Sequence, residues 1–336
     1  MPTPTDKEIT VYPTYGYRDN NGWKIPMRVW VHKQRRADAV PDSLVREIVD
    51  DDGSIQDEEV RRCRDCIADL VADDDSGEAV MFRIDDHSQV YRFSAKTDAN
   101  GIVEQVFEAP GDLHGWLTVT AEVTSALGGK SHTSGRVRLL EPTGNSVVSD
   151  IDDTIKVSEI PAGARIVLRN TFLRPYVAAE GMLDLYRGFG DVAFHYVSGS
   201  PWQLFRLLHK FLIEESGFPA GTFHMKSLRK NPLEPRGFIR DVKNFVAGKE
   251  YTKQQKIEQI SGLMRNLPGR RFTLIGDSGE LDPEVFIHVK ALFPDCVEKI
   301  MIRDVVGAKA NDSGRLPDEI EVIDAPLVTR GKSQFA

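Results

Sequence analysis

The sequence has no apolar run long enough to span a lipid bilayer, and its opening residues, MPTPTDKEIT, lack the charged-then-apolar pattern of a secretion signal. Cysteine is scarce as well, with three among 336 residues, which is typical of proteins kept in a reducing compartment. These absences argue against a membrane-spanning or secreted protein. We expect a cytoplasmic protein whose contact with lipid, if any, is peripheral at the membrane surface.

Positive charge is also in short supply. The chain carries 43 Lys and Arg against 51 Asp and Glu, a formal net charge of -8. This balance argues against bulk binding to nucleic acid and against a broadly basic membrane-binding face, although it leaves room for a local patch. The hydrophobic content of 40% and the charged content of 28% are ordinary for a soluble globular protein, and 336 residues are enough for two domains.

Two of the cysteines lie close together in the motif CRDC, as Cys63 and Cys66. Such a pair could be half of a zinc site or a redox pair, but no second CxxC or HxxxH follows to supply four ligands. The surrounding residues EEVRRCRDCIADLVADDD have helical periodicity, with Val60, Cys63, Cys66 or Ile67, and Leu70 on one face. We therefore interpret both cysteines as small packing residues of an amphipathic helix.

The first part of the chain alternates apolar and polar residues in short segments. Turn signals such as DANG and APGD separate these segments, which together are typical of an antiparallel β-sandwich. The expected strands cover residues 25–32, 79–84, 90–95, 102–109, 116–123 and 136–141. An acidic, helical insertion lies between about residues 41 and 76. We predict a β-rich domain over residues 1–142 that either binds a target or partner or stabilises its neighbour.

After residue 143, apolar runs alternate with helical patterns. The expected strands are SVVSDID, VAFHYVSG, RRFTLIGD and EKIMIRD, and the expected helices are GMLDLYRGF, PWQLFRLLHKFLIEES, KQQKIEQISGLMRNL and PEVFIHVKALF. This alternation predicts an α/β fold in which helices cover both faces of a parallel sheet and ligands gather at the carboxyl ends of the strands. Asp150, Asp152, Ser198 and Asp277 stand at those expected ends.

These polar residues form a set of motifs with a recognisable order. In chain order they are DIDDT with Asp150, Asp152 and Thr154, a strand ending in Ser198, a helix opened by Lys256, and GDSGELD with Asp277 and Asp282. A lone DxDxT is a weak signal, but four motifs in this order resemble the haloacid dehalogenase (HAD-like) superfamily of phosphotransferases.

A narrower resemblance rests on longer segments. SVVSDIDDTIKVSEI, NTFLRPYVAAEGMLDLY, FHYVSGSPWQLF and FTLIGDSGELDPEVF are similar to the actin patch protein type phosphatidate phosphatase catalytic-domain family, and VYPTYGYRDNNGW resembles the region upstream of it. The resemblance covers roughly residues 142–305. It implies a HAD-like Rossmannoid catalytic domain over residues 143–305, followed by a C-terminal extension over residues 306–336.

The resemblance also implies a mechanism, namely phosphate-ester hydrolysis through an aspartyl-phosphate. Asp150 would attack phosphorus, while Asp152 would protonate the leaving alkoxide and later activate water. Ser198 would donate a hydrogen bond to a phosphoryl oxygen. Lys256 would offset the negative charge that builds on Asp150 and the phosphate.

The cofactor implied by the resemblance is Mg²⁺, a hard cation that binds carboxylate, carbonyl and phosphate oxygens. Its expected ligands are the side chains of Asp150 and Asp277, the backbone carbonyl of Asp152, and Asp282 through the metal's water shell. Thr154 and Gly199 are expected to contact the substrate.

Some positions have rivals nearby. Ser200 competes with Ser198 as the phosphoryl donor, and Lys253 competes with Lys256 as the catalytic lysine. We favour Ser198 because it ends the strand. Lys256 is favoured because Ile and Pro follow it at the spacing of the family, before the GDSG strand. Asp153 is expected to be a solvated neighbour or a helper of loop geometry.

The most basic stretch of this acidic chain covers residues 226–243, where Lys226 and Arg229 are expected to bind substrate. A basic rim facing phosphate fits a phospholipid headgroup, and a solvated loop is the alternative. His195 and His224 are expected to be core or rim residues. By resemblance, the leading reaction is phosphatidate to diacylglycerol. The alternatives are a HAD-like phosphatase for a soluble ester and a non-catalytic module that binds phospholipid or phosphoprotein.

Overall fold

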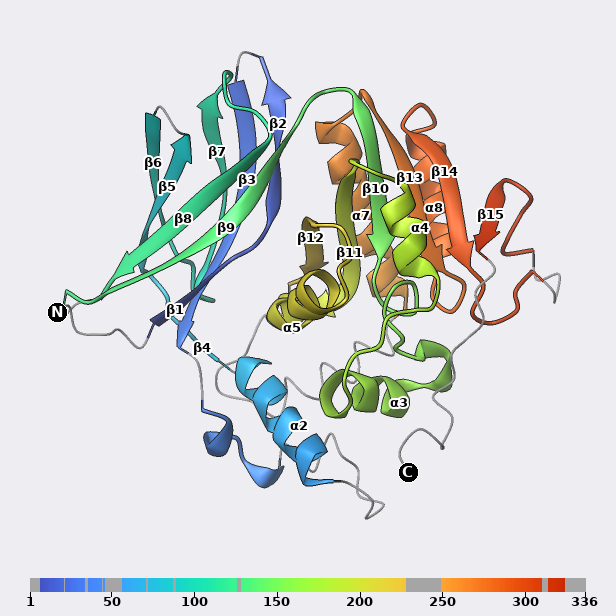
Figure 1. Ribbon diagram of the computed structural model, residues 1–336, viewed down its shortest axis with the longest axis horizontal. Coiled ribbons are helices and arrows are strands. Elements are labelled where there is room, and N and C mark those ends of the chain that lie inside the picture. Colours follow the sequence, from blue (N-terminus) through green and yellow to red (C-terminus); the bar gives the residue numbers. More distant parts are fainter. Residues whose placement is uncertain are drawn as a thin grey trace. The chain divides into compact units, whose positions relative to one another are not determined.

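The computed structural model describes residues 7–20, 22–33, 36–43, 45, 56–70, 72–86, 89–125, 128–227, 249–309 and 314–323 (Figure 1). The chain divides into two compact units. The first comprises residues 1–40, 67–143 and 221–223, and the second comprises residues 41–66, 144–220 and 224–336. None of the helices in the described ranges has the length and apolar character needed to cross a membrane.

The first unit is built on a mixed β-sheet. Its strands are β1 (Lys7–Val11), β2 (Thr14–Asp19), β3 (Gly22–Lys33), β4 (Asp73–Asp74), β5 (Ala79–Asp86), β6 (Gln89–Lys96), β7 (Ile102–Pro110), β8 (Trp116–Thr124) and β9 (Lys130–Leu140), with a short turn of helix η1 (Ala37–Ala39). The strand order is β1-β3-β2-β9-β8-β5-β6, and β4 and β7 pair with β3. All six strands expected from the sequence are present, and β1, β2 and β4 are additional.

The pairing of β2 with β9 corrects one expectation. These two strands run parallel, with Thr14 opposite Val137, whereas the sequence predicted a wholly antiparallel sandwich. Turn signals predict antiparallel neighbours because they join consecutive strands, but β2 and β9 are far apart along the chain. The other pairs of this sheet are antiparallel.

Aromatic side chains show that this sheet folds into two packed layers. Phe107 on β7 lies 4.9 Å from Phe93 on β6 and 5.0 Å from Phe82 on β5, measured between ring centroids. Neither β5 nor β6 is hydrogen-bonded to β7, so these contacts cross the core between layers. Inward residues alternate with outward ones along β8, as a sheet with one buried face requires.

The second unit contains a six-stranded sheet with helices around it. The strands of this sheet are β10 (Gly144–Asp150), β11 (Ala193–Pro201), β12 (Gly221–Lys226), β13 (Arg270–Asp277), β14 (Val297–Arg303) and β15 (Ile320–Ile323), and the first three residues of β12 are those grouped with the first unit. Its helices are η2 (Ile160–Ala162), α3 (Ala164–Leu168), η3 (Arg169–Leu173), α4 (Met182–Gly188), η4 (Trp202–Leu204), α5 (Phe205–His209), η5 (Lys210–Glu215), α7 (Lys249–Asn266) and α8 (Asp282–Leu292). The four expected strands and four expected helices are all present.

The order of this sheet explains where a ligand would bind. It is β12-β11-β10-β13-β14-β15, and the pairs from β11 to β15 are parallel. The chain therefore starts in the middle at β10, moves outward through β11 and β12, and then returns to the other side of β10 as β13. In such doubly wound sheets a crevice opens at the carboxyl end of the strand where the winding reverses. Here that strand is β10.

The predicted amphipathic helix is α2 (Asp57–Leu70). Its Cys63 and Cys66 are free thiols with almost no exposed surface, as expected for packing residues. Burial raises the pKa of the Cys63 thiol to about 12, so this sulfur is held as an unreactive thiol at neutral pH.

Candidate active site

Polar residues at or near the ends of three adjacent strands lie at the carboxyl edge of the second unit's sheet. Asp150 is the last residue of β10, Asp277 is the last residue of β13, and Ser198 lies near the end of β11. All three side chains are buried, with exposed fractions of 2% or less. Because β11, β10 and β13 are neighbours in one parallel sheet, their carboxyl ends meet at the same edge.

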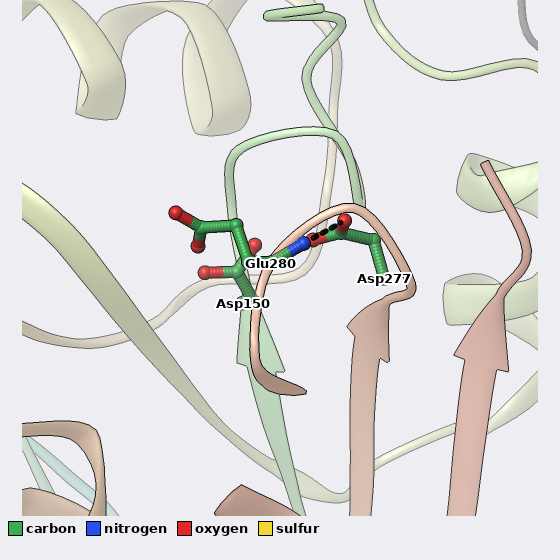
Figure 2. Close-up of side chains that lie close together, drawn as sticks. All are labelled: Asp150, Asp277 and Glu280. Atoms are coloured by element: carbon green, nitrogen blue, oxygen red, sulfur yellow. Dashed lines mark hydrogen bonds between the residues drawn. The ribbon is translucent and has the colours of Figure 1, made fainter. Parts of the chain in front are cut away.

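Three carboxylates at this edge form what we call the acidic cluster, namely Asp150, Asp277 and Glu280 (Figure 2). One oxygen of each lies within 4.8 Å of the others, a spacing that a single cation could bridge. The sequence interpretation missed Glu280. The only signal for it was its position inside GDSGELD, between the two aspartates that were chosen.

The loop after β13 shapes this cluster through its own backbone. Asp277 Oδ1 accepts hydrogen bonds from the N–H groups of Gly279 (2.6 Å) and Glu280 (3.1 Å). Asp277 Oδ2 is buried and has no hydrogen-bond partner among the described residues. At Gly276 a side chain would collide with Asp282, because an added Cβ would lie 2.7 Å from the Asp282 Cβ. The loop thus occupies one oxygen of Asp277 and leaves the other available.

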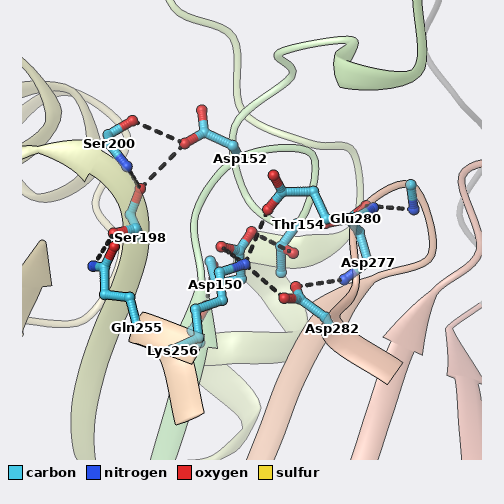
Figure 3. A network of polar contacts seen from close by, with 12 residues as sticks. Asp150, Asp152, Thr154, Ser198, Ser200, Gln255, Lys256, Asp277, Glu280 and Asp282 are labelled. Carbon is cyan, nitrogen blue, oxygen red and sulfur yellow. Dashed lines mark hydrogen bonds and ion pairs between the residues drawn. The ribbon is translucent and has the colours of Figure 1, made fainter. Parts of the chain in front are cut away.

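Lys256, on α7, lies in the middle of the carboxylates (Figure 3). Its Nζ is 2.8 Å from Asp150 Oδ1, 2.6 Å from Asp282 Oδ1 and 3.0 Å from Glu280 Oε2. The other oxygen of Asp282 accepts the backbone N–H of Asp277 at 3.3 Å. Of the two candidate lysines, Lys256 therefore contacts the nucleophile candidate, and Asp282 serves as its counter-ion in this arrangement.

Asp152 lies beside the cluster in a separate set of hydrogen bonds (Figure 3). Its Oδ1 accepts hydrogen bonds from Lys156 Nζ (2.5 Å) and the Ser158 hydroxyl (2.6 Å). Its Oδ2 accepts hydrogen bonds from the hydroxyls of Ser198 (3.2 Å) and Ser200 (3.1 Å). Both serines that competed for the phosphoryl role thus contact Asp152, and their positions relative to it are similar.

The pKa values of the carboxyls differ sharply between the acidic cluster and Asp152. Burial raises the pKa of Asp150 well above its usual range. The Lys256 ammonium acts to lower this pKa, whereas the neighbouring Asp282 and Glu280 raise it further. Burial and neighbouring carboxylates raise the pKa of Asp277 in the same way. Burial also acts to raise the pKa of Asp152, but Lys156 and the hydrogen-bonding hydroxyls outweigh it and lower the pKa to about 2.

The acidic cluster lacks positive charge. Burial also raises the pKa of Glu280, although Lys256 opposes it, so the cluster holds more negative charge than one ammonium balances. Buried carboxylates that are not balanced take up protons or bind a cation. Together with the unpartnered oxygen of Asp277, the donor set fits a hard divalent cation such as Mg²⁺.

Two neighbours in the DIDDT segment have structural contacts. Thr154 donates its hydroxyl hydrogen bond to Asp150 Oδ2 at 3.1 Å, so it holds the nucleophile candidate. Asp153 is buried, has a positive φ of 58°, and accepts hydrogen bonds from the backbone N–H groups of residues 158–160. Of the two expectations for Asp153, a role in loop geometry is therefore confirmed and a solvated position is wrong.

The remaining predicted site residues lie on or beyond the neighbouring strands. Gly199 follows Ser198 on β11 and is partly buried. Lys226 ends β12, where burial lowers the pKa of its ammonium to about 8. Arg229 and the rest of the basic stretch lie outside the described residues, so their role stays a prediction. His195 and His224 lie on β11 and β12, and burial lowers the pKa of His224 to about 4.

Comparison with known proteins gives a match to the same part of the chain. Residues 145–304 match the family model described as "Phosphatidate phosphatase APP1, catalytic domain". The phosphatidate phosphatase APP1 of Saccharomyces cerevisiae is 32% identical over 169 residues, which are 49% of this chain and 26% of the yeast protein. An uncharacterized protein of Schizosaccharomyces pombe is 31% identical over 177 residues, which are 51% of this chain and 27% of that protein.

These two relatives are much longer than the region they share with this chain, which spans about a quarter of their length. Among solved structures, a 2,6-sialyltransferase of Photobacterium has 9% identity and a TM-score of 0.22, covering 70% of this chain and 38% of its own. A likeness this low carries no argument about fold or activity.

Proposed function

We propose, from the match of residues 145–304 to the phosphatidate phosphatase APP1 catalytic domain, that the chain is a Mg²⁺-dependent phosphatase with a HAD-like catalytic domain over residues 143–305. The reaction is hydrolysis of a phosphate monoester through an aspartyl-phosphate, with phosphatidate to diacylglycerol as the leading case. In this proposal residues 1–142 are its companion domain, although residues 41–66 are grouped with the second unit, and residues 306–336 are its C-terminal extension.

One observation carries this proposal. At the point where the winding of the parallel sheet reverses, Asp150 lies beside Asp277 and in contact with Lys256. A phosphate ester is an anion that repels nucleophiles, so its hydrolysis depends on positioning and on neutralising charge. A buried carboxylate flanked by an ammonium and by a set of cation ligands supplies both.

The acidic cluster would hold the Mg²⁺ ion. Asp150, Asp277 and Glu280 offer oxygens close enough to share it. Lys256 contacts Asp150, Glu280 and Asp282 alike, and Asp282 also accepts the Asp277 N–H. When bound, Mg²⁺ supplies positive charge that neutralises the phosphoryl oxygens. Glu280 is thus added to the expected ligands, and Asp282 keeps its proposed role through the metal's water shell.

The first chemical step belongs to Asp150. A carboxylate oxygen of Asp150 forms a bond to phosphorus while the bond from phosphorus to the ester oxygen breaks, and the alcohol leaves after gaining a proton. Thr154 and Lys256 contact different oxygens of Asp150, which fixes the orientation of the carboxylate. Lys256 also offsets the charge that collects on the transferring phosphoryl group.

Asp152 acts as general acid in the first step and as general base in the second. With its pKa lowered to about 2, it is a carboxylate in the arrangement described and can accept the proton of the water that hydrolyses the aspartyl-phosphate. To protonate the leaving alkoxide in the first step, it must separate from Lys156 and take up a proton. Ser198, which donates to Asp152 here, becomes a donor to the phosphoryl oxygens when substrate is bound.

The test is release of inorganic phosphate from a panel of esters. The panel contains dispersed phosphatidate and soluble sugar and nucleotide phosphates, each with Mg²⁺ and with EDTA. We expect Mg²⁺-dependent release from phosphatidate that nearly vanishes in Asp150→Asn, while Asp295→Asn, at an exposed position, stays like the wild type. Wild-type rates in Asp150→Asn would refute the mechanism. Release from soluble esters alone would change the substrate class, and anion binding without release would indicate a binding module.

A further inference from the structure

The loop between β13 and α8 decides whether the acidic cluster can form. Asp277 ends β13 and Glu280 lies within the loop, so two of the three carboxylates move with it. The hydrogen bonds from Gly279 and Glu280 to Asp277 Oδ1 set the curvature of the loop. They do not tie the loop to the rest of the unit. Lys256 on α7 contacts the Glu280 side chain, but the backbone of the loop still needs a connection of its own.

Arg315 makes that connection from the segment before β15. Its Nη1 donates to the backbone carbonyl of Ser278 (2.7 Å), and its Nη2 donates to the carbonyl of Glu280 (2.5 Å). Its Nε and Nη2 also donate to the two carboxylate oxygens of Glu284, in the first turn of α8, at 2.6 and 2.9 Å. One guanidinium thus spans the loop from its first residue to the helix that follows it.

The side of the loop that faces β14 has a second anchor. The Ser278 hydroxyl donates to Asp304 Oδ1 at 2.7 Å and accepts the backbone N–H groups of Val305 (2.9 Å) and Val306 (3.2 Å). This anchor holds Ser278 alone. The carbonyl of Glu280 is held by Arg315, and Glu280 is the residue whose side chain completes the acidic cluster.

We propose that Arg315 is a positioning residue that holds Glu280 and Asp277 in the geometry of a divalent-cation site. It lies beyond residues 145–304, which match the family model, so the C-terminal extension contributes to the catalytic unit. This inference rests on the proposed function, because it assumes that the acidic cluster binds the metal. Partners that orient metal ligands commonly change metal affinity or activity by about 10–100-fold when they are removed.

Arg315 could act through its charge or through its shape, and the two are separable. A guanidinium is a planar fork that can reach two carbonyls and a carboxylate at once, whereas a lysine ammonium carries the same charge at one point. If the fork holds the loop, Arg315→Lys keeps the charge but loses most of the effect. Arg315→Gln loses both.

The experiment measures Mn²⁺ binding to the full chain by electron paramagnetic resonance of the free ion, without substrate. The variants are Arg315→Gln and Arg315→Lys, and the matched control is Arg271→Gln, whose guanidinium donates to the Asp295 carbonyl away from the loop. Thermal unfolding is recorded for each, and binding is measured at a temperature below all transitions. We expect Arg315→Gln to weaken Mn²⁺ binding about 10-fold or more, Arg315→Lys to weaken it several-fold, and Arg271→Gln to bind like the wild type.

Several results would overturn the inference. Wild-type Mn²⁺ affinity in Arg315→Gln would show that the loop needs no such anchor. Wild-type affinity in Arg315→Lys would show that charge, not the fork, is responsible, and an equal loss in Arg271→Gln would show a general effect on folding. If Arg315→Gln does not fold, the comparison of Arg315→Lys with the wild type decides. A wild-type chain that binds no Mn²⁺ would instead refute the metal dependence proposed above.

Discussion

Replacing Lys256 with methionine removes one ammonium from the centre of the acidic site and keeps most of the side-chain volume. The Lys256 Nζ lies 2.6–3.0 Å from three carboxylates and its side chain is 2% exposed. Removing one partner of a buried ion pair typically costs about 3–5 kcal/mol, because the remaining charges stay buried without compensation. At roughly 2–4 °C per kcal/mol, the melting temperature should fall by about 6–20 °C.

The assay is thermal unfolding followed by circular dichroism in EDTA near neutral pH, so that no added cation replaces the ammonium. Lys253→Met is the matched control, since it makes the same change three residues earlier on α7 at a partly exposed position. We expect the control to change stability by no more than about 0.5 kcal/mol. Phosphatase activity should fall by about 10²–10³ in Lys256→Met, because charge stabilisation at the phosphoryl group is lost.

A second substitution makes this reasoning sharper. Asp282→Asn removes the counter-ion that Lys256→Met leaves unpaired, so the double variant should be more stable than Lys256→Met alone, with a coupling of about 0.5–3 kcal/mol. Activity should not return, because Lys256 is still missing. The reasoning fails if Lys256→Met melts like the wild type, or if Lys253→Met shows the larger loss of stability and activity.

Three further predictions concern the same unit. Burial and mutual repulsion raise the pKa of each member of the acidic cluster, so the folded chain binds protons more tightly than the unfolded chain above about pH 4. In EDTA the melting temperature should therefore fall as the pH rises from about 5 to 8, and added Mg²⁺ should reverse this fall. A melting temperature that does not change with pH would contradict this prediction. Asp152, with its pKa lowered to about 2, stabilises the folded chain above its unfolded pKa, and this contribution is lost as the pH falls toward 2. Lys156→Met removes the contribution, so acid unfolding followed by circular dichroism should occur at a higher pH than in the wild type. Gly276→Ala should destabilise the fold by about 1–3 kcal/mol in a urea titration, because the new Cβ would meet Asp282, whereas Gly188→Ala, which meets nothing within 4 Å, should not; equal midpoints for the two variants would show that the loop adjusts freely.

Much of the candidate site followed from local pattern. Apolar runs that end in Asp150, Ser198 and Asp277 predicted strands, and alternation with helices predicted a parallel sheet whose carboxyl ends meet. The structure confirms these strands and the parallel pairing of β10 with β11 and β13, and it adds the strand order around β10. Lys256 could be placed because the residues after it carried the family's spacing, and it does contact Asp150.

Other features depend on contacts between residues that are distant along the chain or on the choice between neighbouring carboxylates. Periodicity does not say that Glu280 joins the acidic cluster while Asp282 accepts the Asp277 N–H, because the path of the chain after β13 depends on its hydrogen bonds. Nor could it show that Lys156 holds Asp152 as a carboxylate, since a lysine four residues away contacts it only when the intervening turn closes.

Hydrophobic periodicity and short motifs were enough to predict the order of the elements, the strand ends that carry the candidate site and the types of residue found there. The parallel pairing of β2 with β9 and the hydrogen bonds of Arg315 to the loop after β13 could not be predicted in this way. Both join segments that lie far apart in the sequence, and no local preference encodes such a pairing. They form because folding brings unsatisfied backbone groups within reach of distant donors and acceptors, which must then be paired.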